Sequence, residues 1–215
     1  MRKYILLILC FVNLLAINKH LPMFSLNTGN IIKDMVIYQD NIIIANDNGT
    51  VETYNYKNKK LIHKIKLEDI KDFMGDMTPP TIFSVDYYNK AYLFLSDSGK
   101  SSYINLWIYK DSKLIKLISD KDKESIIKAK FITKDKILLA YLDNKISLFD
   151  ISTKQYIYKK QLRASKFSDF AMNDEREKAV FSSESGIIDV ININNGVLLR
   201  TLKALNVDNV YSLSF

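Results

Sequence analysis

The sequence predicts an all-β protein, and within that class a β-propeller with about four blades. Three observations carry this prediction. A short unit of several strands recurs four times, most plainly at 42–54, 137–150 and 179–190. The first strands of successive units are expected to begin near residues 31, 81, 127, 167 and 209, a period typical of propeller blades. No long segment shows the apolar period of an amphipathic helix.

Residues 1–16 have the layout of a secretory signal peptide. Arg2 and Lys3 supply positive charge, residues 4–15 are mainly apolar, and Ala16 is a small residue suited to cleavage after it. The apolar run is shorter than a transmembrane helix requires, so we expect export and no membrane span in the mature form. An uncleaved anchor is the alternative, because the residue three before the cut is not small.

Cysteine content and charge restrict the chemistry of the chain. Cys10 is the only cysteine and lies inside the apolar run, so we expect no disulfide and no cysteine-linked haem in the mature chain. The leader has no twin arginine, which favours export in an unfolded state without a cofactor. The net charge of +7 admits nucleic-acid binding. However, the lysines fall largely in turns and alternate with acids, so we interpret them as solvated turn residues and expect no nucleic-acid partner.

Residues 17–30 form an N-terminal segment in which 23–26 is a candidate ring-closing strand, and the blades occupy 31–215. Each blade is expected to have four strands joined by turns of hairpin length. The predicted blades, with their strands in parentheses, are 31–67 (31–38, 41–45, 50–56, 61–67), 81–119 (81–87, 91–96, 103–109, 114–119), 127–162 (127–132, 136–142, 146–150, 156–162) and 167–202 (167–172, 178–183, 187–191, 197–202).

The second strand of each blade is a nearly continuous apolar run. Such a run is typical of a strand that is covered on both faces, here by the two neighbouring blades. We therefore expect Ile43, Leu138 and Val180 to be buried. Gly49 and Gly186 follow these runs and are expected to lie in turns.

Residues 209–215 have the pattern of the first strand of a fifth blade. Propellers close with about 4–8 blades, and a four-bladed ring would leave this strand without a place. We therefore expect an incomplete ring, from a fragment or a truncated gene product. Left unpaired, the strand would present an edge prone to aggregation.

The segment 69–80 interrupts the repeat between the first two blades. Loops that interrupt a rigid scaffold often carry binding residues, which makes this segment a candidate partner-binding loop. Its candidate contact residues are Asp72, Phe73, Met74, Gly75, Asp76, Met77, Pro79 and Pro80.

Two other interpretations of this loop stay open from the sequence. Its three apolar side chains would plug the gap between two blades, with the Pro-Pro pair directing the chain into the second blade. Alternatively, its three aspartates would ligate a hard cation, although their spacing does not match a calcium loop. Its two methionines, with His63 upstream, would suit Cu(I).

No pattern of catalytic residues appears elsewhere. His20 and His63 are the only histidines, and His63 is expected to face solvent on an outer strand. Neither a three-histidine metal site nor a nucleophile–histidine pair is available. The single tryptophan, Trp107, is interpreted as blade packing, because quinoprotein repeats bring many tryptophans. We therefore predict a non-enzymatic protein with no cofactor and no metal.

Several short segments together resemble one known family. They are 71–80 followed by 83–86, then 128–132, 167–171, 184–186 and 206–211. These segments look like the NapL family, WD40-like accessory proteins encoded with periplasmic nitrate reductase in some bacteria. The resemblance covers essentially the whole chain, and the segment 71–80 is its most specific part. The chain differs by ending where family members continue through further blades.

The resemblance implies a periplasmic, Sec-exported WD40-like propeller that supports nitrate respiration. Its expected partners are proteins, namely periplasmic nitrate reductase components or their electron-transfer partners. No catalytic residue is implied. Two alternatives remain: a general cell-envelope scaffold, like the propeller subunit of outer-membrane protein assembly, and a propeller enzyme such as a quinone-dependent dehydrogenase or a lactonase.

Overall fold

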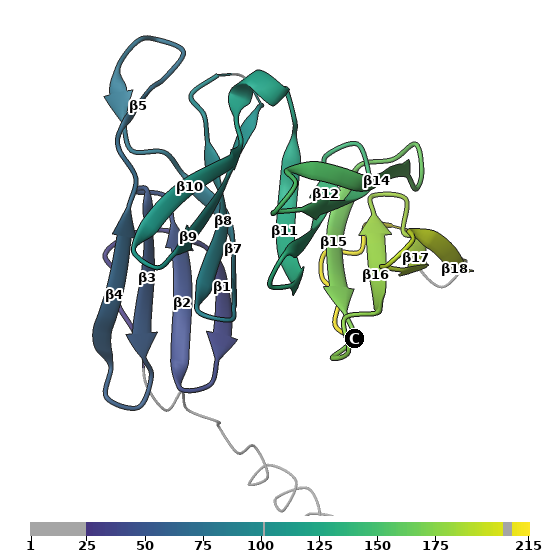
Figure 1. Cartoon of the computed structure of the whole chain (residues 1–215), viewed down its shortest axis with the longest axis horizontal. Helices are drawn as coiled ribbons and strands as arrows, with labels where there is room; N and C mark the ends of the chain where they lie inside the picture. The colour runs from purple at the N-terminus through teal and green to yellow at the C-terminus, as the bar shows by residue number, and fades with distance from the viewer. Residues whose placement is uncertain (1–24, 101, 204–207) are drawn as a thin grey trace, which may run out of the picture.

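Four antiparallel sheets of four strands each make up most of the structure, a computed structural model that describes residues 25–100, 102–203 and 208–215 (Figure 1). Each sheet is one predicted blade, with its strands hydrogen-bonded in chain order. Blade 1 contains β1 (Ile32–Tyr38), β2 (Asn41–Asn46), β3 (Thr50–Asn55) and β4 (Lys60–Lys66); blade 2 contains β7 (Ile82–Tyr88), β8 (Ala91–Asp97), β9 (Ile104–Lys110) and β10 (Lys113–Ile118). Blade 3 contains β11 (Ile126–Thr133), β12 (Lys136–Tyr141), β13 (Lys145–Asp150) and β14 (Gln155–Gln161); blade 4 contains β15 (Phe167–Met172), β16 (Lys178–Ser183), β17 (Ile188–Asn192) and β18 (Val197–Leu202).

The all-β prediction is confirmed, and the sixteen predicted strands agree with the observed ones to within one residue at either end. The turns form where the sequence places them. Gly49 and Gly186 lie in turns with φ of 75° and 72°, a backbone conformation that only glycine adopts without strain. A short β5 (Ile70–Lys71) and β6 (Met77–Thr78) form a separate two-stranded sheet between blades 1 and 2.

The core lies between adjacent blades, in three apolar clusters. Strand β12 shows how one strand serves two of them. Ile137 and Leu139 pack toward blade 2, whereas Leu138 and Ala140 pack toward blade 4. All four are fully buried. Because successive side chains point to opposite faces of a sheet, a strand between two neighbours must be apolar at every position.

Two of the three burial predictions are confirmed and one is wrong. Ile43 and Leu138 are 1% and 0% exposed. Val180 is only half-buried, although its neighbours Ala179 and Phe181 belong to the cluster between blades 3 and 4. Val180 points to the opposite face of blade 4, which has no adjacent blade among the described residues.

The first strands carry a repeated irregularity. Each has a β-bulge at the same register position, and the residue that follows it, called here the bulge residue, is Asp34, Ser84, Lys128 or Asp169. We call the first strand of each blade its inner strand. The side chain of the bulge residue forms a hydrogen bond with the inner strand of the next blade. Asp34 Oδ2 accepts the Val85 N–H at 2.8 Å, and Ser84 Oγ accepts the Ala129 N–H at 3.5 Å. Lys128 Nζ donates to Phe170 O at 3.0 Å instead.

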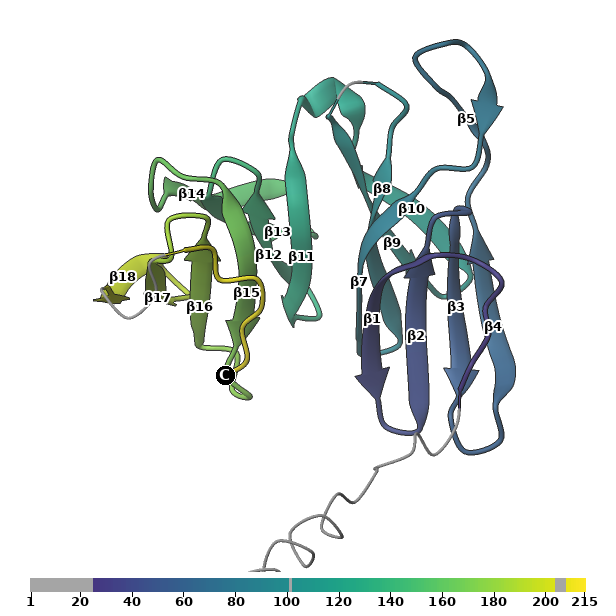
Figure 2. The same ribbon diagram turned by 180° about the vertical axis from the view of Figure 1, so that it is seen from behind.

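The described blades form an open arc, with blades 1 and 4 at its two ends (Figures 1 and 2). Residues 208–215 run beside β15, where Asp169 Oδ2 accepts the Leu213 N–H at 2.9 Å and Ser182 Oγ donates to Val210 O at 3.1 Å. The predicted first strand of a fifth blade is therefore in place but is not a β-strand. It has no second strand within the described residues to pair with.

The remaining predictions on organisation concern the N-terminus and membrane spans. The predicted signal peptide lies outside the described residues, and so do two of the four residues of the candidate ring-closing strand; Ser25 and Leu26 are described and are not in a strand. Within the described part of the chain, no helix is long and apolar enough to cross a membrane.

Candidate interaction site

The predicted partner-binding loop folds as a small β-hairpin. Ile70 pairs with Thr78 and Lys71 with Met77, which forms the β5–β6 ladder. The hairpin projects beyond the ends of the strands of blades 1 and 2 (Figure 1). We call residues 68–80 the hairpin segment.

Asp72 organises the turn of the hairpin. Its Oδ1 atom accepts the N–H of Met74 at 2.8 Å and that of Asp76 at 3.0 Å. The Asp72 N–H in turn donates to Asp76 O at 2.9 Å. Gly75 completes the turn with a φ of 96°. Asp72 and Gly75 are thus structural residues of the turn. In this turn the side chains of Phe73 and Met74 face solvent.

The apolar tip of the hairpin consists of Phe73, Met74 and Met77, and it faces solvent. The three side chains are 90%, 74% and 59% exposed. The interpretation of these residues as a plug between blades is therefore wrong. The tight turn directs them away from the blades.

The base of the hairpin, by contrast, is held closely by one turn from each of the two blades. A Cβ added at Gly99, in the β8–β9 turn, would lie 2.1 Å from Lys71 O. A Cβ at Gly49, in the β2–β3 turn, would lie 3.1 Å from Pro80 Cδ. Pro80 is buried here, whereas Pro79 is exposed. The two glycines allow the hairpin to pack directly on both turns, so a fixed base presents an exposed tip.

The hairpin segment is acidic on a basic protein. It carries Glu68, Asp69, Asp72 and Asp76 against a single base, Lys71, whereas the chain as a whole has a net charge of +7. Within the described residues, no ion pair involves any of these four acids. Their charge is therefore available to a partner.

A cavity of about 410 Å³ lies beside the hairpin base, between blades 1 and 2. Asp69, Pro80 and Lys66 line one side, and Trp107 and Asn105 line the other. The Trp107 indole N–H donates to Ser96 Oγ at 2.9 Å. Lys116 Nζ lies 4.5 Å from the centre of the Trp107 ring, a cation–π contact that covers the indole. Trp107 also packs against the core between these blades, as predicted.

His63 was expected to face solvent, and this is wrong. Its ring centre lies 5.4 Å from that of Tyr92 and 5.3 Å from that of Tyr109, between blades 1 and 2. The alternation of β4 places His63 on the face that meets blade 2. The Tyr92 hydroxyl also lies 3.1 Å from Thr53 Oγ1, so the aromatic contact includes a polar link between the blades.

The metal interpretations have no support in this geometry. In the part of the chain that the structure describes, no group of three or more His, Cys, Asp or Glu side chains is placed to hold a metal ion. His63 lies between two blades, while Met74 and Met77 lie at the exposed tip. The Cu(I) ligands that the sequence offered are thus not brought together.

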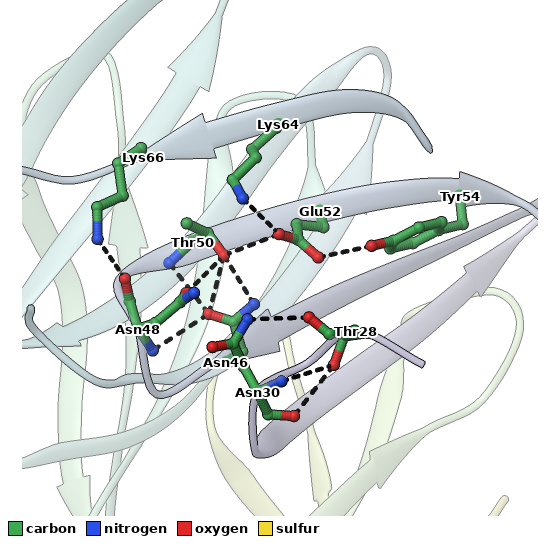
Figure 3. Close-up of polar contacts among 9 residues, drawn as sticks. All are labelled: Thr28, Asn30, Asn46, Asn48, Thr50, Glu52, Tyr54, Lys64 and Lys66. Carbon is green, nitrogen blue, oxygen red and sulfur yellow. Dashed lines mark hydrogen bonds and ion pairs between the residues drawn. The ribbon is translucent and has the colours of Figure 1, made fainter. Parts of the chain in front are cut away.

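A second polar cluster lies on the face of blade 1 that points away from blade 2 (Figure 3). Glu52 is 3% exposed, and its carboxylate contacts Lys64 Nζ at 2.8 Å and the Tyr54 hydroxyl at 2.8 Å. Burial acts to raise the pKa of Glu52, but these hydrogen bonds hold it below its ordinary value. Burial and the neighbouring carboxylate raise the pKa of Tyr54 to about 12.

The adjoining β2–β3 turn is held by amide and hydroxyl groups. Asn46 Nδ2 donates to Thr50 Oγ1 at 2.7 Å, and Asn46 Oδ1 accepts the Thr50 N–H at 3.2 Å. Thr28 and Asn30 form their own hydrogen-bonded turn beside Asn46 (Figure 3). These hydrogen bonds tie the β2–β3 turn to its neighbours, so the cluster stabilises blade 1.

Comparisons with known proteins agree on the fold alone. No family model matches the sequence, and no curated protein matches it. Among solved structures, Raptor from Chaetomium thermophilum superposes with a TM-score of 0.68 at 12% identity, over 89% of this chain and 17% of that one. The computationally designed Ika8 protein superposes with a TM-score of 0.58 at 15% identity, over 86% of this chain and 65% of that one. The chain thus spans less than two thirds of the length of either solved structure. The likeness indicates that its blades are propeller-like.

The sequence predicted an interrupting loop at 69–80, but neither its β5–β6 pairing nor the contacts that support it. The anchoring role of Gly99 and the cavity beside Trp107 depend on contacts between blades. A glycine in the run Ser96-Asp97-Ser98-Gly99 signals a turn, but it does not show which backbone the turn meets.

Proposed function

We propose that this chain is a non-enzymatic, WD40-like β-propeller interaction protein of the periplasm, accessory to the periplasmic nitrate reductase system. The observation that carries the binding role is the apolar tip. Three large apolar side chains stand exposed on a hairpin whose base is packed against two blades. Exposed apolar clusters on a fixed support are typical of protein-binding sites.

The nitrate reductase part of the proposal rests on the resemblance carried by residues 71–80, which include the whole tip. Export rests on the signal-peptide pattern of residues 1–16. The acidic charge of the hairpin segment indicates that the partner surface is basic. An apolar pocket bordered by lysine and arginine would complement both the tip and its four carboxylates.

The test is co-purification from cells that express the tagged chain, with two matched variants. The tip variant replaces Phe73, Met74 and Met77 by serine. The control replaces Leu198 and Leu199 of β18 by serine; these two side chains are also apolar, and each is 49% exposed. We expect nitrate reductase subunits to co-purify with the wild type and the control but not with the tip variant, and all three to unfold at similar temperatures.

Deletion of the gene supplies the second half of the test. Unchanged periplasmic nitrate reductase activity in the deletion strain, together with no co-purifying reductase subunit, would reject the proposal. Recovery of outer-membrane assembly components instead would assign the chain to a general envelope scaffold. A bound cofactor or a tightly held metal in the purified protein would contradict the non-enzymatic assignment.

A further inference from the structure

The cavity between blades 1 and 2 contains a polar atom that has no hydrogen-bond partner among the described residues. Asn105 lines this cavity and is 4% exposed. Its Nδ2 atom donates to Asp97 O at 3.3 Å, whereas its Oδ1 atom is buried and accepts no hydrogen bond from the described part of the chain. A buried acceptor without a donor costs free energy, so a ligand that donates to Asn105 Oδ1 would bind favourably.

The position of Asn105 on β9 explains why its side chain faces the cavity. Side chains alternate along a strand, so Asn105 shares a face with Trp107 and Tyr109. Both aromatic residues pack against the core between blades 1 and 2. Asn105 therefore points into the same interface, at the level of the hairpin base, where Asp69 and Pro80 also line the cavity.

The charges around the cavity favour a cationic ligand. Glu68 and Asp69 line it, and neither forms an ion pair within the described part of the chain. The two lysines of the lining are each held by another group, Lys66 by a main-chain carbonyl and Lys116 by the ring of Trp107. An incoming cation would pair with the two carboxylates, whereas an anion would be repelled by them.

The indole ring adds a preference among cations. Lys116 Nζ lies 4.5 Å from the centre of the Trp107 ring, so this face already attracts a cation. Lys116 is exposed, so its flexible side chain can give way to another cation. A guanidinium is planar and carries five N–H donors. It therefore suits a site that offers a flat ring, the unpaired Asn105 oxygen and carboxylates together.

We propose that this cavity binds the guanidinium group of an arginine side chain from the protein that the hairpin tip contacts. The proposal rests on the partner-binding role of the hairpin, because Asp69 and Pro80 of the hairpin segment line the cavity. An arginine at the basic rim of the partner surface would enter the cavity while the apolar tip enters the partner. Asn105 and Trp107 select the guanidinium, and the carboxylate of Asp69 neutralises its charge.

The test is a fluorescence titration of the purified chain, because Trp107 is the only tryptophan and lines the cavity. The probe is N-acetyl-L-arginine amide, which presents an arginine side chain as a protein does. We expect a saturable change in fluorescence with a dissociation constant on the order of 1 mM, as for other small ligands. The citrulline analogue has nearly the same shape but no charge, and it should bind about tenfold more weakly.

Two carboxylate variants form a matched pair. Asp69→Asn and Asp76→Asn each remove one charge from the hairpin segment, but Asp76 is not among the residues that line the cavity. We expect Asp69→Asn to weaken binding of the arginine amide by about fivefold or more, and Asp76→Asn to change it by less than about twofold. Asn105→Leu removes the acceptor and should weaken binding by about tenfold. Should Asn105→Leu misfold, the two exposed carboxylate variants decide.

Three results would overturn the proposal: no saturable binding, as for a cavity that holds water alone, equal binding of the citrulline analogue, or equal effects of Asp69→Asn and Asp76→Asn. Tighter binding of free L-arginine than of the capped amide would overturn the assignment to a protein side chain. The titration needs no partner protein. A failed titration therefore rejects the cavity and not the tip, whereas a successful one without co-purifying reductase rejects the identity of the partner and not the cavity.

Discussion

Asp169 accepts the main-chain N–H of Leu213 at 2.9 Å, and this contact repeats the one between Asp34 and Val85 at 2.8 Å. In both cases a side chain that follows a β-bulge reaches the segment that comes next along the inside of the arc, which is β7 for Asp34 and residues 208–215 for Asp169. The apolar clusters between blades have no directional preference, whereas a hydrogen bond fixes one alignment. The repeated contact therefore sets the register between neighbouring inner strands.

The contact of Asp34 should contribute measurably to stability. Val85 is fully buried, so Asp34→Ala would leave its N–H without a partner and without water. We expect a loss of about 1–3 kcal/mol in the free energy of unfolding, measured by urea denaturation. The control is Asp40→Ala, which breaks an exposed ion pair with Lys57 and should cost clearly less than Asp34→Ala. Equal losses would show that the inner-strand contact is not structural.

The same contact should hold the C-terminal segment in place. Asp169→Ala removes the acceptor of the Leu213 N–H, so residues 208–215 should leave β15 more often. We expect hydrogen exchange at Leu213 to become faster by about tenfold or more, as for the loss of one part-buried hydrogen bond. Asp174→Ala, at an exposed position of the β15–β16 turn, should leave that exchange rate unchanged. Slow exchange in both variants would mean that other contacts hold the segment.

Gly99 and Gly29 form a matched pair for the anchoring of the hairpin. Both have a φ of 71°, so alanine at either site carries the same backbone strain of roughly 1 kcal/mol. Only at Gly99 does the added Cβ meet another atom, Lys71 O at 2.1 Å, whereas nothing lies within 4 Å at Gly29. We expect Gly99→Ala to lose about 1–3 kcal/mol more than Gly29→Ala in thermal unfolding. It should also speed proteolysis within residues 68–80. Identical behaviour of the two variants would contradict the packing of the hairpin base.

The Glu52 cluster should make stability depend on acidic pH. Burial acts to raise the pKa of Glu52, but hydrogen bonds from Lys64 and Tyr54 keep it below its ordinary value of 4.5. The folded state therefore binds fewer protons than the unfolded state near this pH. The stabilisation by the Glu52 carboxylate is complete above pH 4.5 and is lost as the pH falls through the lower, folded-state value.

Glu52→Gln should remove this part of the pH dependence. We expect the variant to be less stable than the wild type at neutral pH by about 1–3 kcal/mol, the usual effect of hydrogen bonds to a charged group. The difference should shrink as the pH is lowered below 4.5, in urea denaturation at a series of pH values. Glu184→Gln, at an exposed turn position, is the control and should follow the wild type. A constant difference at all pH values would place the effect of Glu52 in packing and not in its charge.

The strands were predictable from the sequence because each blade repeats a local pattern. The apolar run around Leu138 and the turn at Gly49 follow from side-chain alternation and backbone conformation, which neighbouring residues determine. His63 and Val180 were placed wrongly because their burial depends on which face of a blade has a neighbour. The identity of that neighbour is a property of the arc and not of the strand.

For the hairpin, too, some features could be predicted from the sequence and others depended on tertiary contacts. Its position between blades 1 and 2 could be predicted from the break in the repeat, whereas Asp72 and Gly75 were expected as contact residues and instead form the turn. That Phe73 is exposed, and not packed between blades, was decided by the two turns that hold the base at Lys71 and Pro80.

By itself the sequence determined the strand order, the blade boundaries and the place of the irregular segment, since these depend on interactions between residues close in the chain. Only the tertiary structure decided which apolar side chains remain in solvent, among them those of the hairpin tip and Met35 of blade 1. The physical reason is that burial requires a second surface. Whether one is present depends on contacts between segments about 40 or more residues apart, roughly one blade repeat, which no local pattern records.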